Sequence, residues 1–143
     1  MRIGKLLDTK GHEVVTVPPE ATIWEVLAAL DEHGVGALVV SRDGRHPDGI
    51  VSERDIVRQL HARGVAVLES PVAELMSEKV LTAGPEDDVE SLMAVMTSNR
   101  IRHVPVVQDG DLVGIVSIGD VVKERVDALQ EDNRALRDYI YAR

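Results

Sequence analysis

Cysteine and phenylalanine are absent from the 143-residue sequence, and aromatic residues make up only 2% of it. Without cysteine the chain can form no disulfide bond, no thiolate metal site and no cysteine nucleophile. Its five histidines lack metal-ligand spacing, and neither a GxxxxGK loop nor a GxGxxG motif occurs. No activated nucleophile or pair of catalytic carboxylates can be assembled from the remaining residues. We therefore expect a protein without catalytic residues, bound metal or required cofactor.

Long apolar runs and an excess of positive charge are also missing. No stretch approaches the length of a membrane span, and residues 1–11 lack the apolar core of a signal peptide. The formal net charge of −9 disfavours nucleic-acid binding, which needs clustered lysines and arginines. By default, these absences favour a cytoplasmic protein that binds neither membrane nor nucleic acid.

A seven-residue pattern occurs twice, as GIVSERD at residues 49–55 and GIVSIGD at residues 114–120. Each copy reads as the end of a short apolar strand, then a Ser, then an Asp in the first turn of a helix. Free N–H groups and the helix dipole favour an anion at such a junction, and a carboxylate can accept both hydroxyls of a ribose. The pattern therefore predicts a site for a phosphorylated ligand, with an ordinary capping box as the alternative.

The duplication extends beyond this pattern. Thr16 and Pro19 correspond to Thr82 and Pro85, 66 residues further along, whereas the two seven-residue patterns are 65 residues apart. One residue has been lost in the turn between two strands, where changes of length are tolerated. The chain is therefore a tandem repeat of two half-sized units.

Each unit is expected to fold as βαββα, with a core of Val, Leu, Ile and Ala. In the first unit we expect, after a helical lead-in within 1–13, a strand at 14–17, a helix at 22–34, strands at 36–40 and 49–51, and a helix at 52–64. In the second we expect a helical lead-in at 72–76, a strand at 80–83, a helix at 88–98, strands at 104–107 and 112–116 joined by an Asp-Gly turn, and a helix from 117.

The repeated Gly-apolar-x-Ser-x-x-Asp pattern, the apolar strand HVPVV before its second copy, and the order of elements resemble a tandem pair of CBS domains, the regulatory module named after cystathionine β-synthase. The resemblance covers residues 1 to about 125. It implies an α/β (α+β) fold in which two repeats, 1–66 and 67–125, pack as a disc with two clefts related by pseudo-twofold symmetry. It also implies a non-catalytic regulatory role and an adenosine-containing ligand, such as AMP, ADP, ATP, S-adenosylmethionine or NAD(H).

The same resemblance implies which residues bind this ligand. An Asp in each cleft would take the ribose hydroxyls, a Ser would lie beside ribose and phosphate, and a Thr would lie near the base. The residues at these positions are Asp55, Ser52 and Thr16, and Asp120, Ser117 and Thr82.

Three further residues distinguish the two repeats. Arg102 and His103 stand where the first repeat has Gly36 and Ala37, whereas Arg54 stands where the second has a glycine. Because Arg is suited to forked contact with phosphate, we expect the three to bind phosphate and the two clefts to differ in affinity. The alternatives are solvated salt bridges for the arginines and a packed strand-edge role for His103.

The last segment, 117–143, is expected to form one long helix. A seam of apolar residues with one Asn repeats along it at intervals of four and three: Val122, Val126, Leu129, Asn133, Leu136 and Ile140. The helix either reinforces a homodimer as a coiled coil or lies on its own disc.

Together these patterns predict a stand-alone sensor that binds an adenine nucleotide, as in energy sensing, and regulates an unknown protein partner in trans. The alternative is an oligomerisation or partner-docking scaffold without bound nucleotide. A small enzyme acting on a nucleotide is a third and less favoured interpretation.

Overall fold

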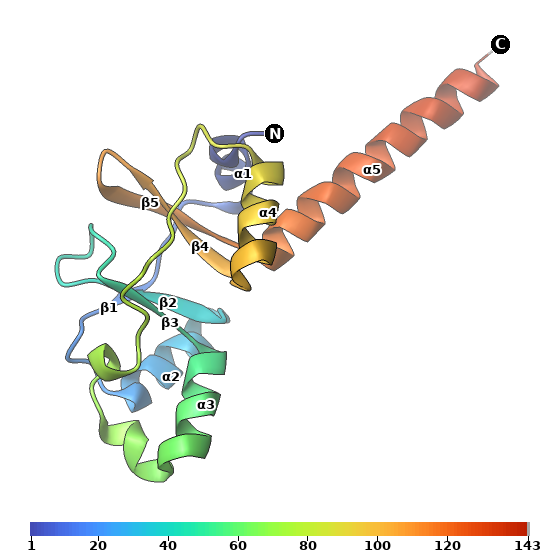
Figure 1. Ribbon diagram of the computed structural model, residues 1–143. Coiled ribbons are helices and arrows are strands. Elements are labelled where there is room, and N and C mark those ends of the chain that lie inside the picture. Colours follow the sequence, from blue (N-terminus) through green and yellow to red (C-terminus); the bar gives the residue numbers. More distant parts are fainter. Residues whose placement is uncertain (143) are drawn as a thin grey trace.

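The first unit is built on a three-stranded sheet in the computed structural model, which describes residues 1–142. Its elements are β1 (Thr16–Val17), α2 (Ile23–His33), β2 (Ala37–Val40), β3 (Gly49–Ser52) and α3 (Glu53–Arg63). The sheet has the order β1-β2-β3, with β1 parallel to β2 and β2 antiparallel to β3. Both helices pack on this sheet through a shared aliphatic core (Figure 1). The mixed α/β character expected from the sequence is confirmed.

The second unit repeats this plan with fewer paired strands. Its elements are α4 (Val89–Asn99), β4 (His103–Gln108), β5 (Asp111–Ser117) and α5 (Ile118–Tyr141). Strands β4 and β5 form an antiparallel hairpin. Asp109 and Gly110 both have positive φ, at 53° and 86°, as the Asp-Gly hairpin turn requires. That prediction is therefore confirmed.

Two predicted strands are shorter than expected, and Pro105 explains the second case. The strand predicted at 14–17 is reduced to β1, and the strand predicted at 80–83 to a single bridge between Ala83 and Val106. In the first unit, the Val39 amide donates to the Val15 carbonyl at 3.4 Å. The residue at the matching position of β4 is Pro105, which has no amide hydrogen to donate. The ladder therefore cannot extend from Ala83 toward residue 81.

The two lead-in segments are exchanged between the cores. Helix α1 (Ile3–Lys10) buries its apolar face in the core of the second unit, and Ile3 donates a backbone hydrogen bond to Asp87 at 2.9 Å. Reciprocally, the 3₁₀ turns Val65–Glu69 and Val72–Glu74 pack in the core of the first unit, and the Val72 amide donates to Ala21 at 2.7 Å. The helical lead-in predicted at 72–76 is thus a short 3₁₀ turn. The division into repeats at residue 66 stays a prediction, but each core contains chain from both sides of it.

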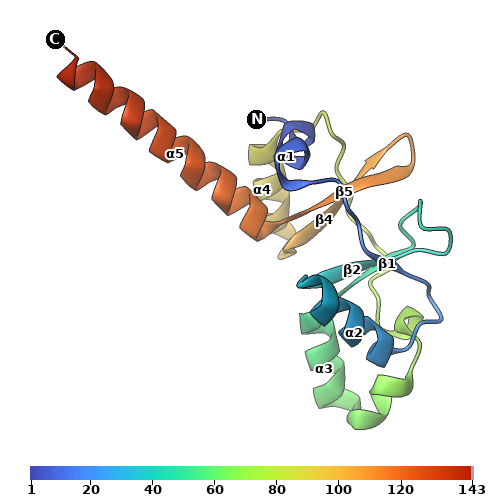
Figure 2. The same ribbon diagram turned by 180° about the vertical axis from the view of Figure 1, so that it is seen from behind.

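Helix α5 projects away from the two units, as two opposite views show (Figures 1 and 2). The five apolar residues of its seam are all between 44% and 58% exposed. The alternative in which this helix lies on its own disc is therefore wrong, because the seam is exposed among residues 1–142. No helix among these residues is long and apolar enough to cross a membrane.

Candidate ligand-binding site

Both copies of the seven-residue pattern form a strand-to-helix junction closed by a capping box. At the first junction Ser52 caps α3: its Oγ accepts from the Asp55 amide at 3.2 Å, and Asp55 Oδ2 accepts from the Ser52 amide at 2.8 Å. Ser117 and Asp120 form the same pair of bonds at the start of α5, at 3.2 and 2.8 Å. The capping role weighed from the sequence is therefore present. Capping leaves room for a ligand, because the capping hydrogen bonds engage only Oδ2 of each Asp. The capping box also holds each carboxylate at the positive end of a helix.

The two junctions lie at the same end of the two hairpins. Ser52 pairs with Ala37 in the first hairpin, and Ser117 pairs with His103 in the second. The His103 ring lies so close to Gly36 that a Cβ atom on Gly36 would be 3.4 Å from it. The imidazole therefore lies close to Gly36 at the boundary between the units.

His103 is partly buried among charged groups from both units. Burial lowers the pKa of its imidazole, and nearby Lys10 lowers it further, against the opposing effects of Glu53 and Asp120. The neutral form of the ring is therefore favoured at pH 7, and an anion bound beside it would raise the pKa. Its place at the boundary between the two junctions fits either role weighed from the sequence, packing or phosphate contact.

Lys10 belongs to the second junction, which the sequence did not indicate. Its Nζ lies 2.5 Å from Asp120 Oδ2 and also donates a hydrogen bond to the Ile115 carbonyl. Burial raises the pKa of Asp120, but the hydrogen bonds from Lys10 and Ser117 outweigh burial and hold that pKa below its usual value. Only the exchange of lead-ins brings α1 here, and no local pattern around Lys10 reveals it.

The first junction has no such cation. The two lead-in segments can be aligned by their packing. Leu7 packs against Gly114 and Met76 packs against Gly49, and each of these glycines is the first residue of a seven-residue pattern. Lys79 then corresponds to Lys10, but it follows a 3₁₀ turn instead of a helix and its side chain is exposed. Within residues 1–142, Asp55 has no ion-pair partner. Lys10 therefore makes the two junctions unequal in charge, and the predicted difference in affinity stays a prediction.

Among residues 1–142, the four remaining predicted site residues form no side-chain hydrogen bond or ion pair with Asp55 or Asp120. Thr16 pairs with Val39 in the sheet, and Thr82 is exposed just before the Ala83 bridge. Arg54 and Arg102 are exposed, and among the described residues neither forms the salt bridge considered as the alternative. Both guanidinium groups remain available to a ligand, and the ligand roles of all four residues stay predictions.

A hollow of about 470 Å³ adjoins the first junction. It is lined by Leu27, Leu30, Asp31, Gly34, Val35, Gly36 and Glu53. Leu27, Leu30 and Val35 make one side of it apolar, whereas Asp31 and Glu53 make another side acidic, and neither Ser52 nor Asp55 lines it. A second hollow, of about 430 Å³, lies between α1 and β5 away from both Asp residues. Residues 1–142 contain no group of three or more side chains suited to a metal ion.

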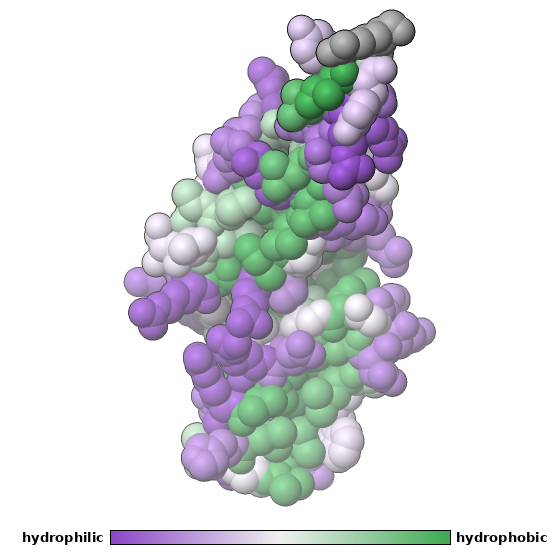
Figure 3. Space-filling view, turned by 90° about the vertical axis from the view of Figure 1, so that its right-hand side faces the viewer, coloured by the Kyte–Doolittle hydropathy of each residue, from purple (hydrophilic) through white to green (hydrophobic). Residues whose placement is uncertain are grey.

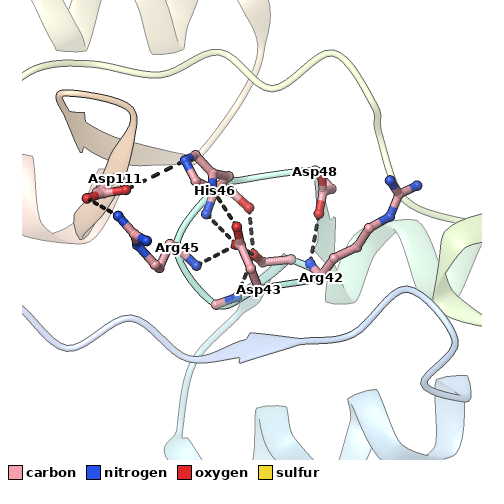
Figure 4. Close-up of polar contacts among 8 residues, drawn as sticks. Arg42, Asp43, Arg45, His46, Asp48 and Asp111 are labelled. Carbon is pink, nitrogen blue, oxygen red and sulfur yellow. Dashed lines mark hydrogen bonds and ion pairs between the residues drawn. The ribbon is translucent and has the colours of Figure 1, made fainter.

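A polar cluster joins the two units at the opposite end of the hairpins (Figure 4). In the turn between β2 and β3, Asp43 accepts hydrogen bonds from the Arg45 and His46 amides, at 2.8 and 2.9 Å. The hydrogen bond to the His46 ring is the largest of several effects that hold the pKa of Asp43 well below its usual value. Arg45 and His46 then reach Asp111 in the other hairpin, at 3.1 and 3.6 Å. These contacts connect the turns of the two hairpins, and both junctions lie at the other end of the hairpins.

A model of the CBS domain family matches residues 8–62 and 72–127 of this chain. The chain belongs to the CBS domain family. The match covers both repeats and confirms the resemblance drawn from the two seven-residue patterns.

Individual CBS proteins resemble this chain over most of its length. The crystal structure of ATU1752 from Agrobacterium tumefaciens is 43% identical, covers 87% of this chain and 99% of its own, and superposes with a TM-score of 0.84. PAE2072 from Pyrobaculum aerophilum, solved in complex with AMP, is 35% identical, covers 91% and 97% of the two chains, and has a TM-score of 0.79. The Arabidopsis thaliana protein "CBS domain-containing protein CBSX3, mitochondrial" is 39% identical over 123 residues, which cover 83% of this chain but only 60% of that protein.

Proposed function

We propose that this CBS protein is a non-catalytic sensor that binds an adenine nucleotide at its strand-to-helix junctions and regulates a protein partner in trans. The observation that carries the proposal is the pair of Asp carboxylates held at helix N-termini by capping boxes. The AMP complex of PAE2072, at 35% identity, supports an adenosyl ligand for the same fold. A cytoplasmic location and a homodimeric state belong to this proposal as well.

Asp120 would receive the ribose at the second junction. Its Oδ2 is engaged by the Ser117 amide and by Lys10, so Oδ1 would be the oxygen that accepts from the ribose hydroxyls. Three side chains would then surround the phosphate. Lys10 would contribute an ammonium group, Arg102 a guanidinium suited to a forked contact, and His103 an imidazole that can take up a proton. This concentration of positive charge favours a phosphorylated ligand over an uncharged nucleoside.

Asp55 would receive the ribose at the first junction, where Arg54 is the nearby cation in sequence. The hollow beside Gly36 and Glu53 offers apolar walls for a base. Lys79 is exposed and, in the part of the chain that the structure describes, forms no ion pair with Asp55, whereas Lys10 contacts Asp120. We therefore expect the first junction to bind phosphate more weakly than the second. Because the lead-ins are exchanged, a ligand at either junction would contact chain from both repeats and would favour one arrangement of the two units.

The test is thermal unfolding of the purified protein with and without AMP, ADP, ATP, S-adenosylmethionine and NAD(H). A ligand at roughly 100 times its dissociation constant stabilises by about 2.7 kcal/mol, which raises the melting temperature by about 5–10 °C for a chain of this size. We expect Asp120→Asn to abolish this shift, since Asn keeps an oxygen for the Ser117 amide but loses the charge. Asp55→Asn would report on the first junction in the same way.

Asp127→Asn is the matched control, because it makes the same change on the exposed surface of α5. An AMP-induced shift that keeps its full size when Asp55→Asn and Asp120→Asn are combined in one chain would refute the ribose role of the carboxylates. No shift with any of the five ligands at millimolar concentration would leave the second candidate function, a docking or oligomerisation scaffold. The exposed seam of α5 favours that candidate, and truncation after Val122 should then abolish assembly.

A further inference from the structure

The seam of α5 has the residue choice of a two-stranded parallel coiled coil. Its spacing assigns Val126, Asn133 and Ile140 to heptad position a and assigns Val122, Leu129 and Leu136 to position d. β-branched residues at a with Leu at d favour parallel dimers over trimers and tetramers. The residue types of the seam therefore favour a coiled coil of two helices.

We infer that two copies of this chain associate through α5 as an in-register parallel coiled coil, with Asn133 of one copy against Asn133 of the other. The inference specifies the homodimer of the proposed function and rests on it. In a parallel pair, position a faces position a, so the two Asn side chains can hydrogen-bond to each other. In an antiparallel pair, position a faces position d, and Asn133 would be buried against a leucine without a partner.

Charges beside the seam complement each other in the same arrangement. Asp132 occupies position g, and Arg137 occupies the following position e, the two positions that meet across a parallel coil. Symmetry provides this opposite-charge contact twice. Within one helix the two residues are not three or four apart, so they do not pair on their own chain.

The structure leaves the seam free for a second copy. Val122 and Val126, nearest the two units, are 51% and 44% exposed, so the body of the molecule covers neither. Figure 3, which views the molecule with α5 rising toward the reader, shows hydrophobic side chains at the surface of this projecting part. The ion pair between Arg125 and Glu90, at 3.6 Å, joins the base of α5 to α4. The base is thereby held to the body while the seam stays open.

Sedimentation velocity of the full chain over a range of concentrations tests the association. We expect a dimer, and we expect Leu136→Asp to raise its dissociation constant at least about tenfold. The neighbouring change Ala135→Asp adds the same charge at position c, outside the seam, and should leave the dimer unchanged. A monomer at every concentration, or equal dissociation by the two variants, would overturn the inference.

Single cysteines test the direction, because the parent chain has none. In a parallel coil Leu129→Cys and Leu136→Cys each meet their own copy and should both give disulfide-linked dimers on oxidation, whereas Ala135→Cys should not. In an antiparallel coil a residue meets its own copy only at the midpoint, so crosslinking by one variant alone, or by neither, contradicts the parallel arrangement. AMP-induced thermal shifts on the same samples separate the two proposals: a monomer that still responds to AMP overturns the coil and leaves nucleotide binding intact.

Discussion

The Lys10–Asp120 contact gives the most informative single perturbation. Lys10→Met keeps most of the aliphatic stem and removes the charge. The two side chains are only 29% and 23% exposed, so the pair lies between a surface salt bridge, worth up to about 1 kcal/mol, and a buried hydrogen bond to a charged group, worth about 1.5–3 kcal/mol. We expect a loss of roughly 1–2 kcal/mol of unfolding free energy at pH 7, or about 3–6 °C in melting temperature.

The pH dependence of this loss identifies its cause. Asp120 has a pKa below its usual value in the folded chain, so its contribution to stability is present above the unfolded pKa of about 3.9 and is lost as the pH falls through the lowered folded value. The difference between wild type and Lys10→Met should therefore be full at neutral pH and should shrink below about pH 4. Urea unfolding monitored by circular dichroism at a series of pH values measures this difference.

Lys79→Met is the matched control, since Lys79 corresponds to Lys10 in the other lead-in but is exposed. It should change stability by no more than about 0.5 kcal/mol. Equal effects of the two substitutions, or a Lys10→Met deficit that persists unchanged at pH 3, would refute the assignment of Lys10 to the second junction. In binding experiments, Lys10→Met should weaken AMP and leave adenosine unaffected, because the lysine is expected to serve the phosphate.

Two further predictions concern His103 and the end of α4. Burial lowers the pKa of His103, and a bound phosphate would raise it. AMP affinity should therefore increase as the pH falls from the pKa of the complex toward the lowered pKa of the free protein, because the complex takes up a proton over this range. Calorimetric titration of the His103→Gln variant should lack this proton uptake and show only the titration of the phosphate itself. Arg100 ends α4 with φ of 54° where α2 ends at Gly34, so Arg100→Gly should stabilise the fold by roughly 0.5–1 kcal/mol and Gly34→Ala should destabilise it by a similar amount. Thermal unfolding measures both changes, and destabilisation by Arg100→Gly or stabilisation by Gly34→Ala would contradict an origin in backbone strain.

The sequence by itself determined the features that depend on neighbouring residues. The Ser-x-x-Asp pattern fixed both capping boxes, and the Asp-Gly dipeptide fixed the hairpin turn, because such signals act within a few residues. The heptad spacing of α5 was likewise readable. Duplication of these local signals revealed the tandem repeat and, with it, the family.

Only the tertiary structure decided how distant segments meet. Burial of the apolar faces of the lead-ins is non-directional and could be satisfied by either core, so the sequence did not show that α1 crosses to the second unit and brings Lys10 to Asp120. The place of His103 beside Gly36 and the contact of Arg45 and His46 with Asp111 likewise depend on how the two hairpins pack. Whether the α5 seam is covered also depends on the direction in which the helix leaves the hairpin, and this is set by long-range packing.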